Sequence, residues 1–197
     1  MGFASPPEDA AAGVFPPDIG SADAGWQALL TAAHTLGRVL LARGWMLGCA
    51  ESCTGGLVAA AVTSLAGSSQ WFERGLVTYS NAAKGELLGV PEPVLREHGA
   101  VSEATALAMA RGMLAHAPVQ AALAVTGIAG PGGGSADKPV GLVWFAWAWQ
   151  TPGGPDSRAE AVRWPGDRQE VRMASAQYAL RGMSQCLQEP AGTTPHR

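Results

Sequence analysis

The chain has 197 residues, of which 47% are hydrophobic and 15% are charged, a composition that favours a compact globular domain over a disordered chain. Its formal net charge of -3 gives no reason to expect binding to nucleic acid or to an anionic membrane surface. Cys49, Cys53 and Cys186 do not have the spacing of a disulfide framework or of a zinc site.

The amino-terminal residues carry no pattern of a targeting signal. No basic stretch is followed by an apolar one, and no apolar run approaches the roughly 20 residues of a membrane helix. Pro6 occupies the position where a myristoylation motif needs Ser or Thr. We therefore expect a cytoplasmic protein with one domain at 26–188, between flexible tails at 1–25 and 189–197.

Helices and strands are predicted to alternate through the first half of the domain. In order, the expected elements are a helix at 26–43, a strand at 45–49, a helix at 57–65, a strand at 74–80 and a short helix that carries Lys84. Ser80 or Asn81 is expected to cap this short helix. Pro91 and Pro93 are expected to interrupt the chain after it.

The second half is predicted to be richer in strands. The expected elements are a helix capped by Ser102, strands at 119–125, 140–149 and 158–164, and a last helix opened by Asp167 and Glu170 as a capping box. The tryptophans at 144, 147 and 149 are expected to serve the core and a dimer interface rather than a ligand. Together the two halves predict a three-layer α/β/α sandwich with a mixed sheet.

Polar or glycine-rich loops follow three of the predicted strands. They are the turn that contains Ser52, the segment 79–84 and the loop 126–135. In open α/β sheets, ligands bind at loops beyond the carboxyl ends of strands. We therefore expect these three loops to converge on one crevice.

The turn Ala-Glu-Ser-Cys-Thr-Gly-Gly at 50–56 has three possible roles. Its backbone N–H groups could bind a phosphate, although the Lys-Ser or Lys-Thr pair of a phosphate loop is missing. Ser52 could instead be a nucleophile, although the turn lacks the Gly-x-Ser-x-Gly pattern. Ser52 or Thr54 could also be a plain helix cap, and Cys53 is a second nucleophile candidate that its expected burial beside Cys49 disfavours.

Lys84 is the strongest candidate for a general base. Only Lys84 and Lys138 are lysines among the 13 basic residues, whereas no histidine falls in the three loops. A buried lysine can lose its proton and accept one from serine, which an arginine cannot. The alternatives for Lys84 are a solvated surface lysine or a fixed charge that faces an anionic substrate.

Other residues of the loops are candidate substrate ligands. Glu51 could orient a substrate amide or a ribose, or could merely hydrogen-bond the turn. The glycine-rich loop that begins at Thr126 offers backbone donors without side-chain bulk, which suits a phosphate or a ribose, and is otherwise a mobile surface loop.

Several motifs together resemble the CinA carboxy-terminal domain family. They are Ala-Glu-Ser-Cys-Thr-Gly-Gly at 50–56, Gly-Leu-Val-Thr-Tyr-Ser-Asn-Ala-Ala-Lys at 75–84, Leu-Gly-Val at 88–90, Gly-Ala-Val-Ser at 99–102, Thr-Gly-Ile-Ala-Gly-Pro-Gly-Gly-Gly at 126–134, Lys-Pro-Val-Gly at 138–141 and Gly-Asp-Arg at 166–168. The resemblance runs from about Trp26 to Leu187. Larger members carry a pyrophosphatase-like domain before this one, and that activity is not expected from the short segment here.

The resemblance implies an amidase that converts nicotinamide mononucleotide to nicotinate mononucleotide and ammonia in pyridine nucleotide recycling. It also implies a fold like that of anticodon-binding domains, a homodimer, and a serine nucleophile with a lysine base at Ser52 and Lys84. We expect Tyr79 to orient Lys84 or relay a proton, and no metal or cofactor to be required. The expected substrate ligands are Glu51, Thr54, Gly55, Gly56, Asn81, Thr126, Gly127, Gly130, Gly132 and Gly133.

In the mechanism expected from these residues, the backbone N–H groups around 54–56 stabilise the oxyanion. The loop at 130–134 and an arginine, from this chain or a partner chain, hold the 5′-phosphate. Two other classes stay open: a nucleotide-binding module without catalysis, and an amidase with a different amide substrate.

Overall fold

A computed structural model describes residues 20–188 of the chain. In order, the elements of this range are α1 (Gly20–Arg43), β1 (Leu47–Glu51), α2 (Leu57–Thr63), the 3₁₀ helix η1 (Ser68–Gln70), β2 (Phe72–Val77), α3 (Asn81–Leu88), α4 (Glu92–His98), α5 (Glu103–His116), β3 (Ala121–Gly127), β4 (Leu142–Thr151), β5 (Gly154–Arg163) and α6 (Arg168–Gln188). None of the described helices is both long and apolar enough to cross a membrane.

The five strands form one mixed sheet in the order β2-β1-β3-β4-β5. Strands β2, β1 and β3 are parallel to one another, whereas β3 pairs with β4, and β4 with β5, in antiparallel fashion. The carboxyl ends of β1, β2 and β3 therefore lie at one edge of the sheet. The expected edge strand near the carboxyl terminus is β5, which pairs only with β4 among the described strands.

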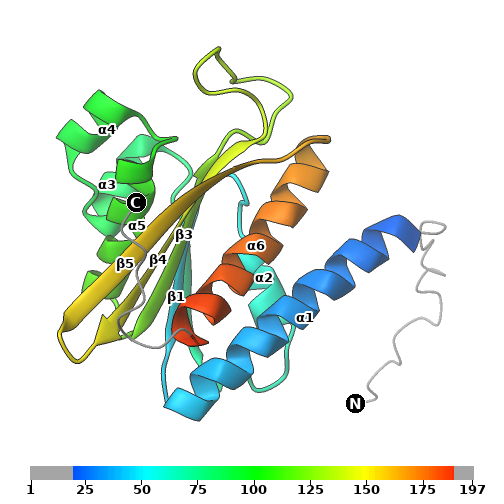
Figure 1. Cartoon of the computed structure of the whole chain (residues 1–197), viewed down its shortest axis with the longest axis vertical. Helices are drawn as coiled ribbons and strands as arrows, with labels where there is room; N and C mark the ends of the chain where they lie inside the picture. The colour runs from blue at the N-terminus through cyan, green and yellow to red at the C-terminus, as the bar shows by residue number, and fades with distance from the viewer. Residues whose placement is uncertain (1–19, 189–197) are drawn as a thin grey trace, which may run out of the picture.

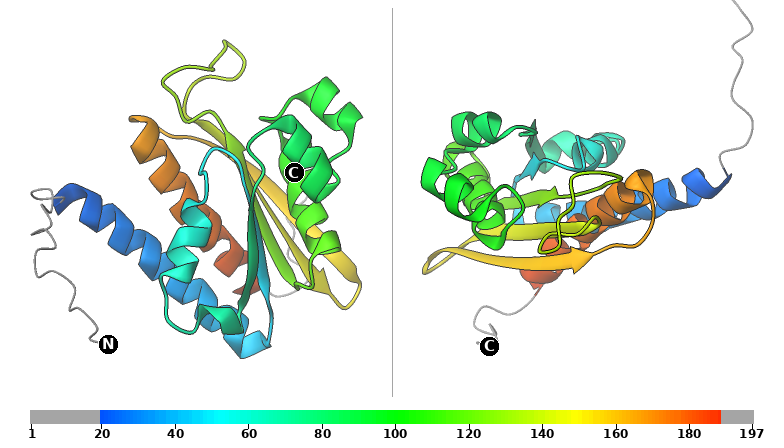
Figure 2. Two further views of the ribbon diagram at one scale, coloured as in Figure 1. Left: turned by 180° about the vertical axis from the view of Figure 1, so that it is seen from behind. Right: turned by 90° about the horizontal axis from the view of Figure 1, so that it is seen from above.

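Helices cover both faces of the sheet, as Figure 1 shows: α1, α2 and α6 lie on one side, and α3, α4 and α5 on the other. The views from behind and from above show the same two layers (Figure 2). The predicted three-layer α/β/α sandwich with a mixed sheet is confirmed.

The alternation of side chains along the central strand β3 decides how each layer packs. Leu123 and Val125 face the layer of α1, α2 and α6, whereas Ala122 and Ala124 face α5. Strand β4 repeats this division, with Phe145 on the first face. The small alanines let α5 approach the sheet closely, and the larger side chains fill the wider space under the two long helices.

Trp147 is the largest side chain that is fully buried. Its indole Nε1 donates a hydrogen bond to the carbonyl of Ala179, 2.8 Å away on α6. A Cβ at Gly182 would lie 2.1 Å from the indole ring, so a larger residue there would push α6 off the sheet. The expected core role is therefore found at Trp147, while Trp144 and Trp149 are only partly buried.

The strands lie about two residues away from their predicted bounds. Strand β1 ends at Glu51, whereas the prediction followed the apolar run and stopped at Cys49, although a buried carboxylate is uncommon in a strand. The structure resolves this conflict because Glu51 is bonded to backbone amides. Strand β3 likewise runs to Gly127, and the hydroxyl of Thr126 is bonded to the carbonyl of Ala100.

Two helix predictions were wrong. Helix α1 begins at Gly20 and not at Trp26, so residues 20–25 are helical and not part of a tail; the remaining predicted tails, 1–19 and 189–197, lie outside the described residues. Helix α4 occupies the segment that Pro91 and Pro93 were expected to interrupt. Pro93 stands in its first turn, where a missing N–H leaves no helical hydrogen bond unmade.

Candidate active site

The three predicted loops do meet beyond the carboxyl ends of β1, β2 and β3. Lys84 Nζ, on helix α3 just after β2, lies 3.1 Å from Ser52 Oγ, in the turn after β1. Arg168 at the start of α6 connects the second loop with the third, because its guanidinium donates to the hydroxyl of Tyr79 and to the carbonyl of Gly130. The expected convergence is confirmed, and α6 is a fourth contributor.

Helix α3 holds Lys84 beside Ser52. Ser80 caps this helix by accepting a hydrogen bond from the N–H of Ala83 at 3.0 Å, and Lys84 follows within the first turn. Its side chain is only 1% exposed, and its ammonium group also donates to the carbonyl of Thr78 at 2.8 Å. Burial lowers the pKa of Lys84 below its ordinary value of 10.5, because the neutral amine is favoured when water is removed.

Ser52 lies at the mouth of this arrangement, with 8% of its surface exposed. Its backbone N–H donates to the carbonyl of Val125 at 2.9 Å, which continues the pairing of β1 with β3 by one residue. The backbone of Ser52 is thus held in place by the last hydrogen bond between the central strands β1 and β3. Of the two candidate bases, Lys84 contacts Ser52, whereas Lys138 donates to the carbonyl of His98 and anchors the glycine-rich loop.

Glu51 caps helix α2 rather than facing a ligand. One carboxylate oxygen accepts from the N–H groups of Gly56 and Val58 at 3.0 and 3.1 Å, and the other accepts from Ala59 at 2.9 Å. The residue has no exposed surface. Its predicted role as a substrate ligand is therefore corrected: the simpler alternative, hydrogen bonding of the turn, is the one observed.

Glu51→Gln should lower the free energy of unfolding by about 2–4 kcal/mol, because the amide loses a charge that three N–H groups share and turns an NH₂ toward one of them. Thermal unfolding should show a fall in midpoint of about 4–16 °C. The exposed Glu103→Gln in the first turn of α5 is the matched control and should stay within about 0.5 kcal/mol of the wild type. Equal effects of the two changes would contradict the capping role.

The glycines of the turn at 50–56 shape the backbone rather than supply free donors. Gly55 and Gly56 have φ angles of 60° and 95°, which side-chain-bearing residues rarely adopt. Their N–H groups are already bonded, to the carbonyl of Ser52 and to the carboxylate of Glu51. These N–H groups are therefore engaged within the turn, and substrate binding at Gly55 and Gly56 stays a prediction.

Two backbone donors remain in the turn. Within the described part of the chain, the N–H groups of Cys53 and Thr54 donate to no other residue. The thiol of Cys53 is an unsuitable nucleophile, because burial raises its pKa to about 12 and keeps it protonated. Thr54 is fully buried, its hydroxyl has no hydrogen-bond partner among the described residues, and its carbonyl accepts from Arg172 at 2.8 Å.

Some of the remaining predicted substrate ligands are engaged in contacts within the fold, and the others are exposed to solvent. Thr126 is buried and bonded to Ala100, and a Cβ at Gly127 would lie 2.7 Å from the backbone of β4, so both serve the fold. Gly130 uses its carbonyl to bind Arg168. The positions with exposed surface are Asn81, Gly132 and Gly133, the last two on the loop that projects beyond the sheet in Figure 1.

Tyr79 does not orient Lys84 through its ring. The hydroxyl lies 3.1 Å from Arg168 Nη2, and only the backbone carbonyl of Tyr79 approaches Lys84 Nζ, at 3.5 Å. The carbonyl of Thr78 is the closer acceptor and is the orienting group that the sequence did not reveal. A backbone atom carries no residue-type signal, so only the structure could find it.

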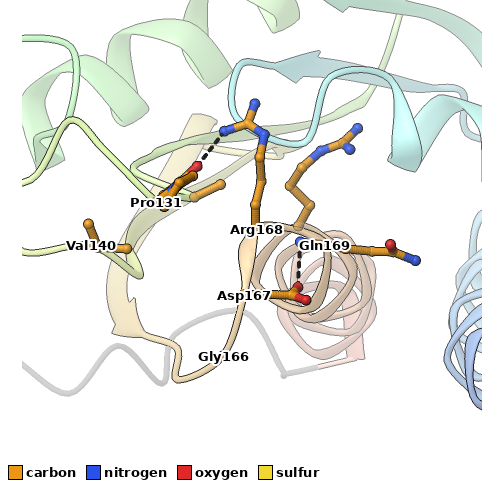
Figure 3. A pocket seen from close by; sticks show the side chains of 9 residues that line it. Pro131, Val140, Gly166, Asp167, Arg168 and Gln169 are labelled. Carbon is orange, nitrogen blue, oxygen red and sulfur yellow. Dashed lines mark hydrogen bonds between the residues drawn. The ribbon is translucent and has the colours of Figure 1, made fainter.

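A pocket of about 620 Å³ lies between the glycine-rich loop and the start of α6, and its lining residues Arg168 and Arg172 connect it to Tyr79 and Thr54. Figure 3 shows Arg168 reaching across it toward the loop, while Asp167 turns back to the N–H of Gln169. Arg172, one turn further along α6, also lines the pocket. Both arginines belong to this chain, and the Gly-Asp-Arg motif at 166–168 was the sequence signal for the first of them.

No group of three or more possible metal-binding side chains occurs among the described residues.

The fold and the site define a class: an α/β protein with a buried serine–lysine pair next to a pocket lined by arginine. The chain belongs to the CinA C-terminal domain family, whose model matches residues 30–187. The resemblance seen in the sequence motifs is thereby confirmed.

Relatives and solved structures agree with this assignment. The chain is 54% identical, over 147 residues, to a nicotinamide-nucleotide amidohydrolase of Enterobacter agglomerans, a match that covers 74% of this chain and 87% of the relative. It is 49% identical to the protein of that name from Escherichia coli K12, with 80% and 93% covered. The crystal structure of a competence/damage inducible protein from Agrobacterium tumefaciens matches with a TM-score of 0.76 and 44% identity, covering 82% of this chain and 96% of that one.

Proposed function

We propose that the chain hydrolyses the carboxamide of nicotinamide mononucleotide, giving nicotinate mononucleotide and ammonia. The observation that carries the proposal is the contact of 3.1 Å between the buried amine of Lys84 and Ser52 Oγ. Serine hydrolysis of an amide needs a base at this position. The relatives named as nicotinamide-nucleotide amidohydrolases support the choice of substrate.

Acylation begins when the neutral amine of Lys84 takes the proton of Ser52 and the serine oxygen attacks the carboxamide carbon. The N–H groups of Cys53 and Thr54 are the donors available to the resulting oxyanion. The C–N bond then breaks, Lys84 returns the proton to the leaving nitrogen, and ammonia departs. An ester between Ser52 and the nicotinoyl group remains.

Deacylation repeats the sequence with water. Lys84 takes a proton from the water molecule, the oxygen attacks the ester carbon, and the ester bond to Ser52 breaks. The proton on Lys84 passes to Ser52 Oγ, and the carboxylic acid loses its own proton to solvent. The enzyme returns to its starting state without a redox step.

The 5′-phosphate is assigned to Arg168 and Arg172. Their guanidinium groups line the pocket of about 620 Å³, beside the backbone of Gly130. Arginine suits a phosphate because its fixed charge and planar donors match the phosphate oxygens. The phosphate ligand is thus proposed to come from this chain, and a partner chain is not needed for it.

Arg168→Ala should raise KM for nicotinamide mononucleotide about 10- to 100-fold and change kcat much less, because one charge-assisted contact to the phosphate is lost. Steady-state kinetics with the nucleotide and with nicotinamide riboside, which has no phosphate, measure this. Use of the riboside should fall much less than use of the nucleotide, because the riboside has no phosphate and is affected only through the bond of Arg168 to Tyr79. The exposed Arg181→Ala on α6 is the matched control. A similar loss with the riboside would remove the phosphate role.

Release of ammonia and formation of nicotinate mononucleotide in equal amounts test the proposed function directly. Free nicotinamide and NAD are the comparison substrates. Binding of the nucleotide without ammonia release would favour a non-catalytic binding module, and faster release from another amide would replace the substrate.

We also propose a cytoplasmic homodimer with a role in pyridine nucleotide recycling. Light scattering measures the oligomeric state, and cell fractionation measures the location.

A further inference from the structure

Tyr79 is the most exposed of the large hydrophobic or aromatic side chains among the described residues, at 61%. It is nevertheless held at both ends. Its backbone carbonyl lies 3.5 Å from Lys84 Nζ, and its hydroxyl lies 3.1 Å from Arg168 Nη2. The ring therefore spans the distance between the buried amine and the arginine, with much of its surface uncovered.

A substrate of the proposed function must cross the same distance. Its carboxamide has to reach Ser52, and its phosphate is assigned to Arg168 and Arg172, so the pyridine ring and the ribose lie between them. In nicotinamide mononucleotide the ring nitrogen is bonded to the ribose, and the ring is a pyridinium cation. An aromatic face attracts such a cation through its negative quadrupole.

The carboxylates of these loops are already occupied by backbone groups. Glu51 accepts from three N–H groups of α2, and Asp167 accepts from the N–H groups of Gln169 and Glu170. The positive charges of Arg168 and Arg172 would repel a pyridinium ring. The phosphate of the same substrate neutralises part of that charge. An uncovered aromatic face is thus the feature of the site best suited to the ring charge.

We propose that Tyr79 is a specificity-determining residue on which the cationic pyridinium ring of the substrate stacks, so that the site prefers a charged ring to a neutral one. This inference rests on the proposed function. In this arrangement the bond from Arg168 fixes the plane of the phenol, and the stacked ring aligns the carboxamide with Ser52.

The test compares nicotinamide mononucleotide with its reduced form, which has the same carboxamide, ribose and phosphate but an uncharged dihydropyridine ring. Binding of both is measured by calorimetry on the full chain with Ser52→Ala, which prevents turnover. The preference for the charged ring should fall about three- to tenfold when Tyr79→Leu is added. Tyr79→Phe, which keeps the ring, should retain most of the preference.

Three outcomes would overturn the inference: equal weakening of both ligands by Tyr79→Leu, no weakening of either, or a loss of preference with Tyr79→Phe as large as with Tyr79→Leu. The last would assign the effect to the hydroxyl and Arg168. Thermal unfolding checks that each variant is folded, and the exposure of Tyr79 favours this. Loss of the proposed function would look different, because the wild type would then release no ammonia from nicotinamide mononucleotide.

Discussion

Ser52→Ala should lower kcat for ammonia release by about 10⁴- to 10⁶-fold. This is the range found when one residue is removed from a set of catalytic residues that act together. Nucleotide binding should change little, because Ser52 is only 8% exposed and the arginines to which the phosphate is assigned are unchanged. Stopped assays for ammonia, together with calorimetric binding, measure the two quantities separately. Mass spectrometry of the wild type mixed with substrate and quenched with acid should detect a nicotinoyl nucleotide ester on Ser52.

Cys53→Ala is the matched control for this variant. Cys53 is the next residue of the same turn, and its thiol stays protonated because burial raises its pKa to about 12. Its side chain is therefore expected to take no part in the chemistry, and the variant should keep activity within about tenfold, apart from a small loss of packing. Activity that survived Ser52→Ala but disappeared with Cys53→Ala would transfer the nucleophile to the thiol.

The order of elements along the chain predicted most of the fold and placed Ser52 and Lys84 at the ends of neighbouring strands. Apolar runs that end in polar turns identify strands followed by loops, and adjacent parallel strands bring those loops to one edge of the sheet. The scarcity of lysine and the position of Lys84 just after a strand end made it the candidate base, and the resemblance to the CinA family then implied its pairing with Ser52. Neither step required contacts between distant residues.

The parts of the site that could not be predicted depend on such contacts. Glu51 looked like a substrate ligand, since its burial follows only from three amides of α2 that close around it. Arg172 carries no local signal, because its place beside Thr54 depends on how α6 packs across the sheet. Pro93 was taken as a break, although the same residue is favourable in the first turn of a helix.

Lys84→Met should abolish catalysis almost as completely as Ser52→Ala, because the methionine fills the same space but accepts no proton. A general base contributes about 10²- to 10⁴-fold, and Lys84 acts in both acylation and deacylation. Lys84→Arg keeps the positive charge and should be equally inactive, because arginine does not deprotonate. Retained activity with Lys84→Arg would show that a fixed charge is enough.

The pH dependence follows from the same buried amine. Its pKa is lowered by burial, so kcat/KM should rise with pH through that lowered value, and the acidic limb of the profile should end below the ordinary 10.5 of lysine. Between these two pKa values the unfolded chain binds a proton that the folded chain does not, so stability should also rise with pH across this window. Denaturant unfolding at several pH values measures this rise, and Lys84→Met should lack it. A wild type and a Lys84→Met variant with the same pH dependence of stability would mean that Lys84 stays charged in the folded protein, and the base role would then be lost.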